Sequence, residues 1–148
     1  MSDLTEKVDV TRLAHYVNKV QELSTTNRTM APAYLRDMIV GQDVAANLLA
    51  RAIQSDNRAK AQVEKAEAIA YLDNAREYLE QRNIKDTSEA RKQYVHIDQA
   101  VQDAKEQRAK TEAMVVYLKS VLSQLRQAHD DLKKITYGDN NSTPYEGM

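Results

Sequence analysis

Only three glycines and two prolines interrupt this chain of 148 residues. A sheet protein needs many tight turns, and such turns use residues that tolerate a positive φ or that preset φ. A chain with so few of these residues favours long helices. The glycines, Gly41, Gly138 and Gly147, are also too far apart to form a phosphate-binding loop. We therefore expect an all-α fold without P-loop or dinucleotide-fold chemistry.

Two short helices are expected first. Asp9 precedes apolar residues spaced three and four apart, which predicts a helix over about residues 10–24. Pro32 suits the first turn of a second helix over about 32–40. We expect this helix to kink or break at Gly41, because a glycine inside a helix costs about 1 kcal/mol relative to alanine.

Two long helices are expected next. No glycine or proline occurs over residues 43–83, and apolar residues recur throughout, which predicts one long helix. Asp86 and Glu89 then have the spacing of a capping box, which predicts a second long helix over about 87–136 with a glycine stop at Gly138. A short connection makes consecutive helices antiparallel neighbours. The expected product is a long antiparallel helical hairpin.

The second long helix has a coiled-coil pattern, in which steps of four and three residues alternate. The positions of this seam are Ala90, Tyr94, Ile97, Val101, Ala104, Arg108, Thr111, Val115, Leu118, Leu122, Leu125, His129 and Leu132. A second apolar stripe lies beside its C-terminal half, and one partner helix cannot cover both. The first helix and the segment before Gly41 can cover part of this face in a small three- or four-helix core, which leaves the rest for a subunit interface. Because an elongated hairpin has little core for its surface, we expect a homo-oligomer. Its predicted interface comprises Met114, Leu118, Val121, Leu125, Ala128, Leu132 and Ile135.

The helices predict a single domain over residues 1–138, followed by a disordered tail over 139–148 that holds turn-forming residues. No segment reaches the roughly 18 apolar residues that span a bilayer, and the first residues lack a basic segment followed by an apolar one. The absence of cysteine fits a reducing compartment. We expect a cytoplasmic protein that has no membrane partner.

Motifs for catalysis or metal binding are not found. His15, His96 and His129 are far apart in the chain, and no pair has the spacing of a helical metal site. Serine is present, but no nucleophile elbow accompanies it. We expect no enzymatic activity, no metal and no cofactor, and we interpret His129 as a partly buried polar residue that fixes the register of the seam.

Basic residues offer a better lead. The formal net charge is −1, from 21 basic and 22 acidic side chains, so nucleic-acid binding would depend on where the cations lie. If the hairpin folds about residues 85 and 86, six basic residues lie side by side in the middle of the hairpin. They are Arg58, Lys60, Lys65, Lys105, Arg108 and Lys110. Arg108 replaces an apolar seam residue. It either binds phosphate, buries its aliphatic stem while its charged end reaches solvent, or pairs with an acid such as Glu64 or Glu67. The candidate phosphate contacts are Arg58, Lys60, Lys65, Arg76, Lys105, Arg108 and Lys110.

Further cations surround the tip of the hairpin, mixed with acids in a pattern that also suits a solvated helix face. Three aromatic residues, Tyr71, Tyr78 and Tyr94, lie near these cations. Tyrosine rings beside cations can stack on the bases of a single strand. The spacing of these three favours packing within the hairpin over stacking.

Four features follow one another between residues 45 and 135. They are Ala45-Ala46-Asn47, Asn74-Ala75-Arg76 before Tyr78, a polar break over 83–88, and Asp98-Gln99-Ala100-Val101 before a leucine-rich helix ending near Ile135. In this order the chain resembles the UvsY-type recombination mediators of T4-like phages. The resemblance implies a ring-forming helical protein that binds single-stranded DNA. In that family a Lys-Ala-Arg element contributes to DNA binding; here Asn74 stands at the lysine position and Arg76 matches.

From the resemblance and the cations we expect a non-enzymatic, single-stranded DNA-binding accessory protein of phage recombination or replication. The resemblance implies that it loads a RecA-like recombinase on DNA covered by single-strand-binding protein, in the host cytoplasm. The alternative is a helical protein–protein interaction or scaffolding module without nucleic-acid binding, which includes a phage inhibitor of a host protein. Its partner would bind the wide apolar face near Met114 to Ile135.

Overall fold

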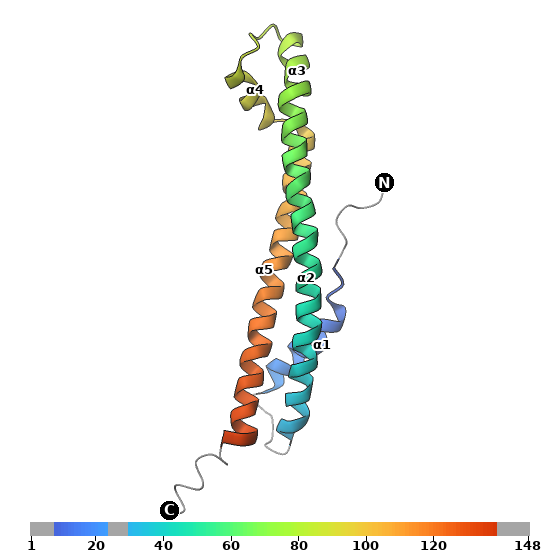
Figure 1. The fold of residues 1–148 in the computed structure, drawn as a ribbon, viewed down its shortest axis with the longest axis vertical. Coiled ribbons are helices and arrows are strands. Elements are labelled where there is room, and N and C mark those ends of the chain that lie inside the picture. Colours follow the sequence, from blue (N-terminus) through green and yellow to red (C-terminus); the bar gives the residue numbers. More distant parts are fainter. Residues whose placement is uncertain (1–7, 24–29, 139–148) are drawn as a thin grey trace, which may run out of the picture. The chain divides into compact units, whose positions relative to one another are not determined.

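The computed structural model describes residues 8–23 and 30–138, and within these ranges it contains helices and no strand (Figure 1). The expected all-α class is confirmed. The elements are α1 (Thr11–Glu22), α2 (Ala31–Ile69), the π-helical turn η3 (Ala70–Asn74), α3 (Ala75–Gln81), α4 (Ser88–Val95), α5 (Gln99–Lys133) and the π-helical turn η4 (Lys134–Gly138). None of these helices combines the length and apolar character needed to cross a membrane.

The chain divides into two compact units where the sequence predicts a single domain. Among the described residues, unit 1 holds 52–115, and unit 2 holds 8–23, 30–51 and 116–138. Helices α2 and α5 each contribute one part to each unit. The predicted tail, residues 139–148, lies outside the described residues.

In unit 2, α1 packs against the first part of α2. It begins near the predicted residue, where Asp9 Oδ1 accepts a 2.9 Å hydrogen bond from the Thr11 amide. Lys19 Nζ lies 2.6 Å from Asp37 Oδ2, and this hydrogen bond raises the pKa of Lys19. The helix also buries Leu13 completely. Polar contacts and burial together hold α1 in place.

The predicted break at Gly41 is wrong, because α2 runs without interruption from Ala31 to Ile69. Gly41 is buried, and a Cβ added there would lie 3.0 Å from Tyr16 Cγ. The glycine therefore lets the Tyr16 ring approach the backbone of α2. Burial of this large ring, which is 8% exposed, offsets the helix-propensity cost of glycine.

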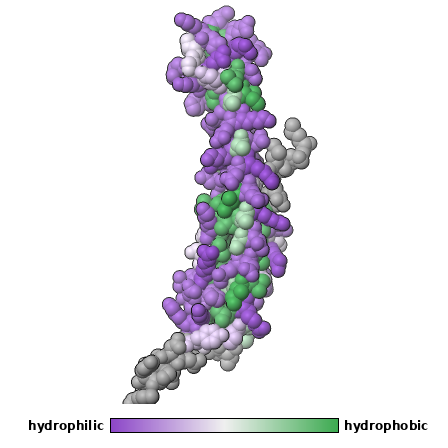
Figure 2. Space-filling model, viewed as in Figure 1, coloured by the Kyte–Doolittle hydropathy of each residue, from purple (hydrophilic) through white to green (hydrophobic). Residues whose placement is uncertain are grey.

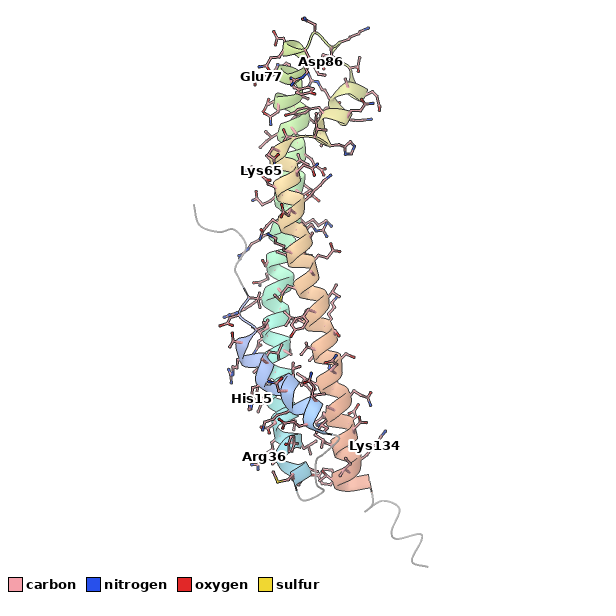
Figure 3. All side chains as sticks on the ribbon, turned by 180° about the vertical axis from the view of Figure 1, so that it is seen from behind. His15, Arg36, Lys65, Glu77, Asp86 and Lys134 are labelled. Carbon is pink, nitrogen blue, oxygen red and sulfur yellow. The ribbon has the colours of Figure 1, made fainter. Side chains whose placement is uncertain are left out.

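The apolar face assigned to a subunit interface is mostly covered within the chain. Five of its members are at most 3% exposed: Leu118, Val121, Leu125, Ala128 and Leu132. Met114 is half-buried, and Ile135 is 42% exposed. Figure 3 shows α1, labelled at His15, lying across the parts of α2 and α5 that belong to unit 2. These five side chains are therefore buried without a second copy of the chain.

In unit 1 the second predicted long helix is two helices. Helix α4 ends at Val95, and α5 begins only at Gln99. Ile97 was predicted to occupy the seam but is 59% exposed, whereas Val101 is fully buried. The seam pattern therefore begins at Val101. The break arises because Asp98 leaves the helix and caps the next one, with Oδ1 accepting a 3.1 Å hydrogen bond from the Val101 amide.

The turn between α3 and α4 lies where the sequence predicts a polar break. Asn83 ends the helix with φ 54°, a left-handed conformation that asparagine tolerates. The predicted capping box does not form. Thr87 is the N-cap instead, and its Oγ1 accepts a 3.1 Å hydrogen bond from the Ala90 amide. Asp86, the predicted cap, forms an ion pair with Arg91 instead.

Helices α2 and α5 run antiparallel within unit 1. Thr111 Oγ1 donates a 2.8 Å hydrogen bond to Asp56 Oδ1, and Lys105 Nζ lies 3.8 Å from Glu67. Later residues of α2 thus meet earlier residues of α5. Alanines at the contact, including Ala52 and Ala59, are at most 2% exposed and let the two backbones approach closely.

Replacing Gly41 by leucine should lower the free energy of unfolding by about 1–3 kcal/mol, because the new side chain must displace the Tyr16 ring. Urea denaturation measures the change. Ala46→Leu, at an exposed position of the same helix, is the matched control and should change stability by less than about 0.5 kcal/mol. Equal stability of the two variants would contradict the close approach of Tyr16.

Candidate nucleic-acid interface

A π-helical turn and α4 are joined by one arginine in unit 1. Arg91 Nη1 donates to the carbonyl oxygens of Tyr71 and Leu72 in η3, at 3.2 and 3.4 Å. Its Nε and Nη2 each lie 2.7 Å from a carboxylate oxygen of Asp86. This hydrogen bonding lowers the pKa of Asp86 and raises that of Arg91. Arg91 therefore has a structural role and is not free to bind phosphate.

A buried carboxylate connects three elements of the same unit. Asp98 is 4% exposed, and its Oδ2 accepts hydrogen bonds from Tyr94 Oη at 2.7 Å and Asn74 Nδ2 at 3.2 Å. Its other oxygen caps α5 at the Val101 amide. We call these four groups the Asp98 cluster. It links η3, α4 and α5, and so orders the part of unit 1 that carries Arg76, Arg82 and Lys85.

Two opposing effects set the ionisation of the Asp98 cluster. Burial by itself would raise the pKa of Asp98, but the hydrogen bonds from Tyr94, the Val101 amide and Asn74 outweigh it and hold the pKa below its usual value. Burial, together with the hydrogen bond to Asp98, raises the pKa of Tyr94 to about 12. At neutral pH the cluster thus contains a carboxylate and a neutral phenol.

Three of the seven predicted phosphate contacts have acidic partners within the chain. The pairs are Lys105 with Glu67 at 3.8 Å, Arg108 with Asp56 at 3.7 Å, and Lys110 with Glu106 at 3.9 Å. Arg108 therefore pairs with an acid, as one interpretation of its seam position holds, but the acid is Asp56 and not Glu64 or Glu67. These cations would have to leave a carboxylate before binding a phosphate.

The other four predicted contacts, Arg58, Lys60, Lys65 and Arg76, are exposed and have no ion-pair partner among residues 8–23 and 30–138. They do not form one belt. Arg58 and Lys65 are seven residues apart and share one side of α2, whereas Lys60 is two residues beyond Arg58 and faces a different side. Arg76 is on α3.

More exposed cations lie at the end of unit 1 where α3 turns into α4. Lys85 and Arg82 are in the turn, and Lys92 is on α4. Figure 2 shows this end of the unit covered mostly by hydrophilic residues. Arg82 belongs to the cations that the sequence predicts around the tip, and it lies over the ring of Tyr78. The four-residue spacing of Tyr78 and Arg82 across the C-terminal end of α3 is the signal that could have identified this contact.

Within the described ranges, no group of three or more histidine, cysteine, aspartate or glutamate side chains could hold a metal ion. His129 is half-buried on α5, with Nδ1 3.6 Å from Asp130. Comparison of the chain with protein-family models, curated proteins and solved structures finds no match.

Replacing Asp98 by asparagine should lower the free energy of unfolding at neutral pH by about 2 kcal/mol, because hydrogen bonds to a charged group are lost. The folded-state pKa of Asp98 is below the unfolded value, so its contribution is present above about pH 4 and disappears as the pH falls through the folded pKa. Urea denaturation should therefore show the difference between variant and wild type narrowing below about pH 4.

The control for this substitution is Asp103→Asn, at an exposed position of α5 where Asp103 Oδ1 accepts a 2.8 Å hydrogen bond from Gln99 Nε2. It should change stability by less than about 0.5 kcal/mol. If both variants were as stable as wild type at neutral pH, the Asp98 cluster would not hold the three elements together.

Proposed function

We propose that this protein is a non-enzymatic, single-stranded DNA-binding accessory protein of phage recombination or replication, which helps to load a RecA-like recombinase on DNA covered by single-strand-binding protein. The recombinase and its role rest on the resemblance to UvsY-type mediators. The observation that supports DNA binding is a set of exposed cations on a braced part of unit 1. The set includes Arg76, Arg82 and Lys85.

The ordered backbone matters for affinity. A cation whose surroundings are already ordered loses less conformational entropy when it binds a phosphate. Hydrogen bonds hold the segment that carries these cations. Arg91 donates to the Tyr71 carbonyl and to Asp86, and Asp98 accepts a hydrogen bond from Tyr94. Its cations therefore project from a defined backbone. We assign the main phosphate contacts to six of the exposed cations for which no ion pair is found among the described residues: Arg58, Lys60, Lys65, Arg76, Arg82 and Lys85. Arg76 also interacts electrostatically with Asp86.

We further propose that α2 and α5 form one long antiparallel hairpin and that the chain assembles as a homo-oligomer. Burial of the predicted interface stripe moves the proposed contact to apolar side chains that remain exposed. On unit 2 these include Val116, Tyr117 and Ile39, which are 62%, 45% and 47% exposed. Several copies would bring several modest cation sets to one strand, which raises affinity through multivalency.

A second candidate function is the helical protein–protein interaction or scaffolding module without nucleic-acid binding. It is favoured by large apolar side chains that remain exposed in unit 1, since such side chains are typical of partner surfaces when they cluster. Leu72 and Ile97 are both 59% exposed. Retention on immobilised single-stranded DNA separates the two candidates.

The full chain should be retained on an immobilised single-stranded DNA column at low salt and released by moderate salt, because phosphate binding displaces counterions. The double variant Lys65→Glu with Arg76→Glu should elute at clearly lower salt. The double variant Lys119→Glu with Arg126→Glu makes the same two charge reversals at exposed residues outside the proposed contacts and should shift elution much less. Passage of wild type through the column at low salt would reject DNA binding and favour the scaffolding module.

A further inference from the structure

A groove of about 640 Å³ lies in unit 1, and its walls come from α2, η3, α4 and the first turns of α5. Its apolar lining comprises Ala68, Tyr71, Leu72 and Val95. Leu72 is 59% exposed, and Arg91 Nη1 donates to its carbonyl oxygen at 3.4 Å. The groove therefore presents an exposed leucine on an ordered backbone.

Charged residues of opposite sign line this groove from different helices. Glu64 and Glu67 belong to α2, Lys92 to α4 and Lys105 to α5, and His96 completes the lining. Lys105 is paired with Glu67. Glu64 and Lys92 are exposed, and neither has an ion-pair partner within residues 8–23 and 30–138. An occupant of the groove can therefore pair with an acid on one wall and a base on another.

A stripe with matching chemistry lies on the part of α2 that belongs to unit 2, where Figure 3 labels Arg36. Four exposed residues of this helix have the i, i+3, i+4, i+7 spacing of one helix face: Arg36, Ile39, Val40 and Asp43. Ile39 and Val40 are 47% and 43% exposed. Arg36 and Asp43 have no ion-pair partner in the part of the chain that the structure describes. We call these four residues the α2 stripe.

We propose that the α2 stripe of one copy of this chain docks in the groove of a second copy. The two aliphatic side chains of the stripe cover Leu72. At the rim of the groove, Arg36 pairs with Glu64. Asp43 pairs with Lys92. This inference rests on the proposed homo-oligomer and names two surfaces that meet in it.

Charge complementarity and helix geometry favour a second copy as the occupant. A helix that lays anchors at i, i+3, i+4 and i+7 into an apolar groove is a recurring mode of recognition. The stripe supplies a base for Glu64 and an acid for Lys92, and the exposed pairs at the rim mainly set its orientation. Arg36 and Glu64 lie on the same uninterrupted helix, and one continuous helix cannot fold back on itself. The stripe therefore binds the groove of another copy.

Leu72→Glu should weaken self-association of the full chain by about tenfold or more, because a charge replaces the leucine that the stripe covers. Sedimentation velocity over a range of protein concentrations measures the dissociation constant. Ile97→Glu is the matched control, since Ile97 is also 59% exposed but does not line the groove. This control should associate like wild type. Circular dichroism checks that both variants are helical.

A charge swap tests whether the stripe is the occupant. Arg36→Glu and Glu64→Arg should each weaken self-association by about threefold to tenfold, because each variant brings like charges together. The double variant that carries both substitutions should associate like wild type, because the pair is restored with the opposite polarity. An equimolar mixture of the two single variants should also associate, since the stripe of each variant matches the groove of the other.

The outcomes separate the proposals. Equal association of Leu72→Glu and Ile97→Glu would overturn the groove as a site of self-association. Weakening by Leu72→Glu without recovery in the double charge variant would overturn the α2 stripe as the occupant. A monomeric wild type would overturn both this contact and the proposed homo-oligomer. Binding of oligo-dT, measured separately by fluorescence anisotropy, decides the proposed DNA binding on its own.

Discussion

The order of unit 1 depends on the hydrogen bonds that the buried carboxylate of Asp98 accepts. It accepts hydrogen bonds from a residue of η3, a residue of α4 and the first turn of α5. A carboxylate that is 4% exposed is costly unless its oxygens are satisfied, so each of these donors is needed. Tyr94 and Val101 lie four residues before and three residues after Asp98, whereas Asn74 lies 24 residues before it, and their shared acceptor fixes the break between α4 and α5.

This constraint connects the fold to the proposed chemistry. Asp98 orients Tyr94, which packs on Tyr78. The Arg82 guanidinium lies over the Tyr78 ring. Arg91 braces the same region from α4 by bonding carbonyl groups of the π-helical turn. A short segment of chain thus presents exposed cations on an ordered backbone. This ordering, and not net charge, is the basis of the proposed DNA binding.

Periodicity was sufficient to predict the helical class and the polar turn near Asn83, because these depend on local spacing. It failed where a contact distant in sequence decides the outcome. Gly41 stays helical because Tyr16 packs on it, and α5 starts late because Asp98 bonds Asn74, 24 residues earlier in the chain. The candidate site was predicted only in part, since the spacing of charges cannot show which cations are paired with acids across helices. Exposure and pairing require the packed structure.

Fluorescence anisotropy of a labelled oligo-dT, titrated with the full chain at low and at moderate salt, tests the central claim most directly. The claim is that exposed cations on a braced helical unit bind a single strand through its phosphates. The account predicts saturable binding at low salt that weakens steeply as salt increases. No binding even at low salt would contradict it.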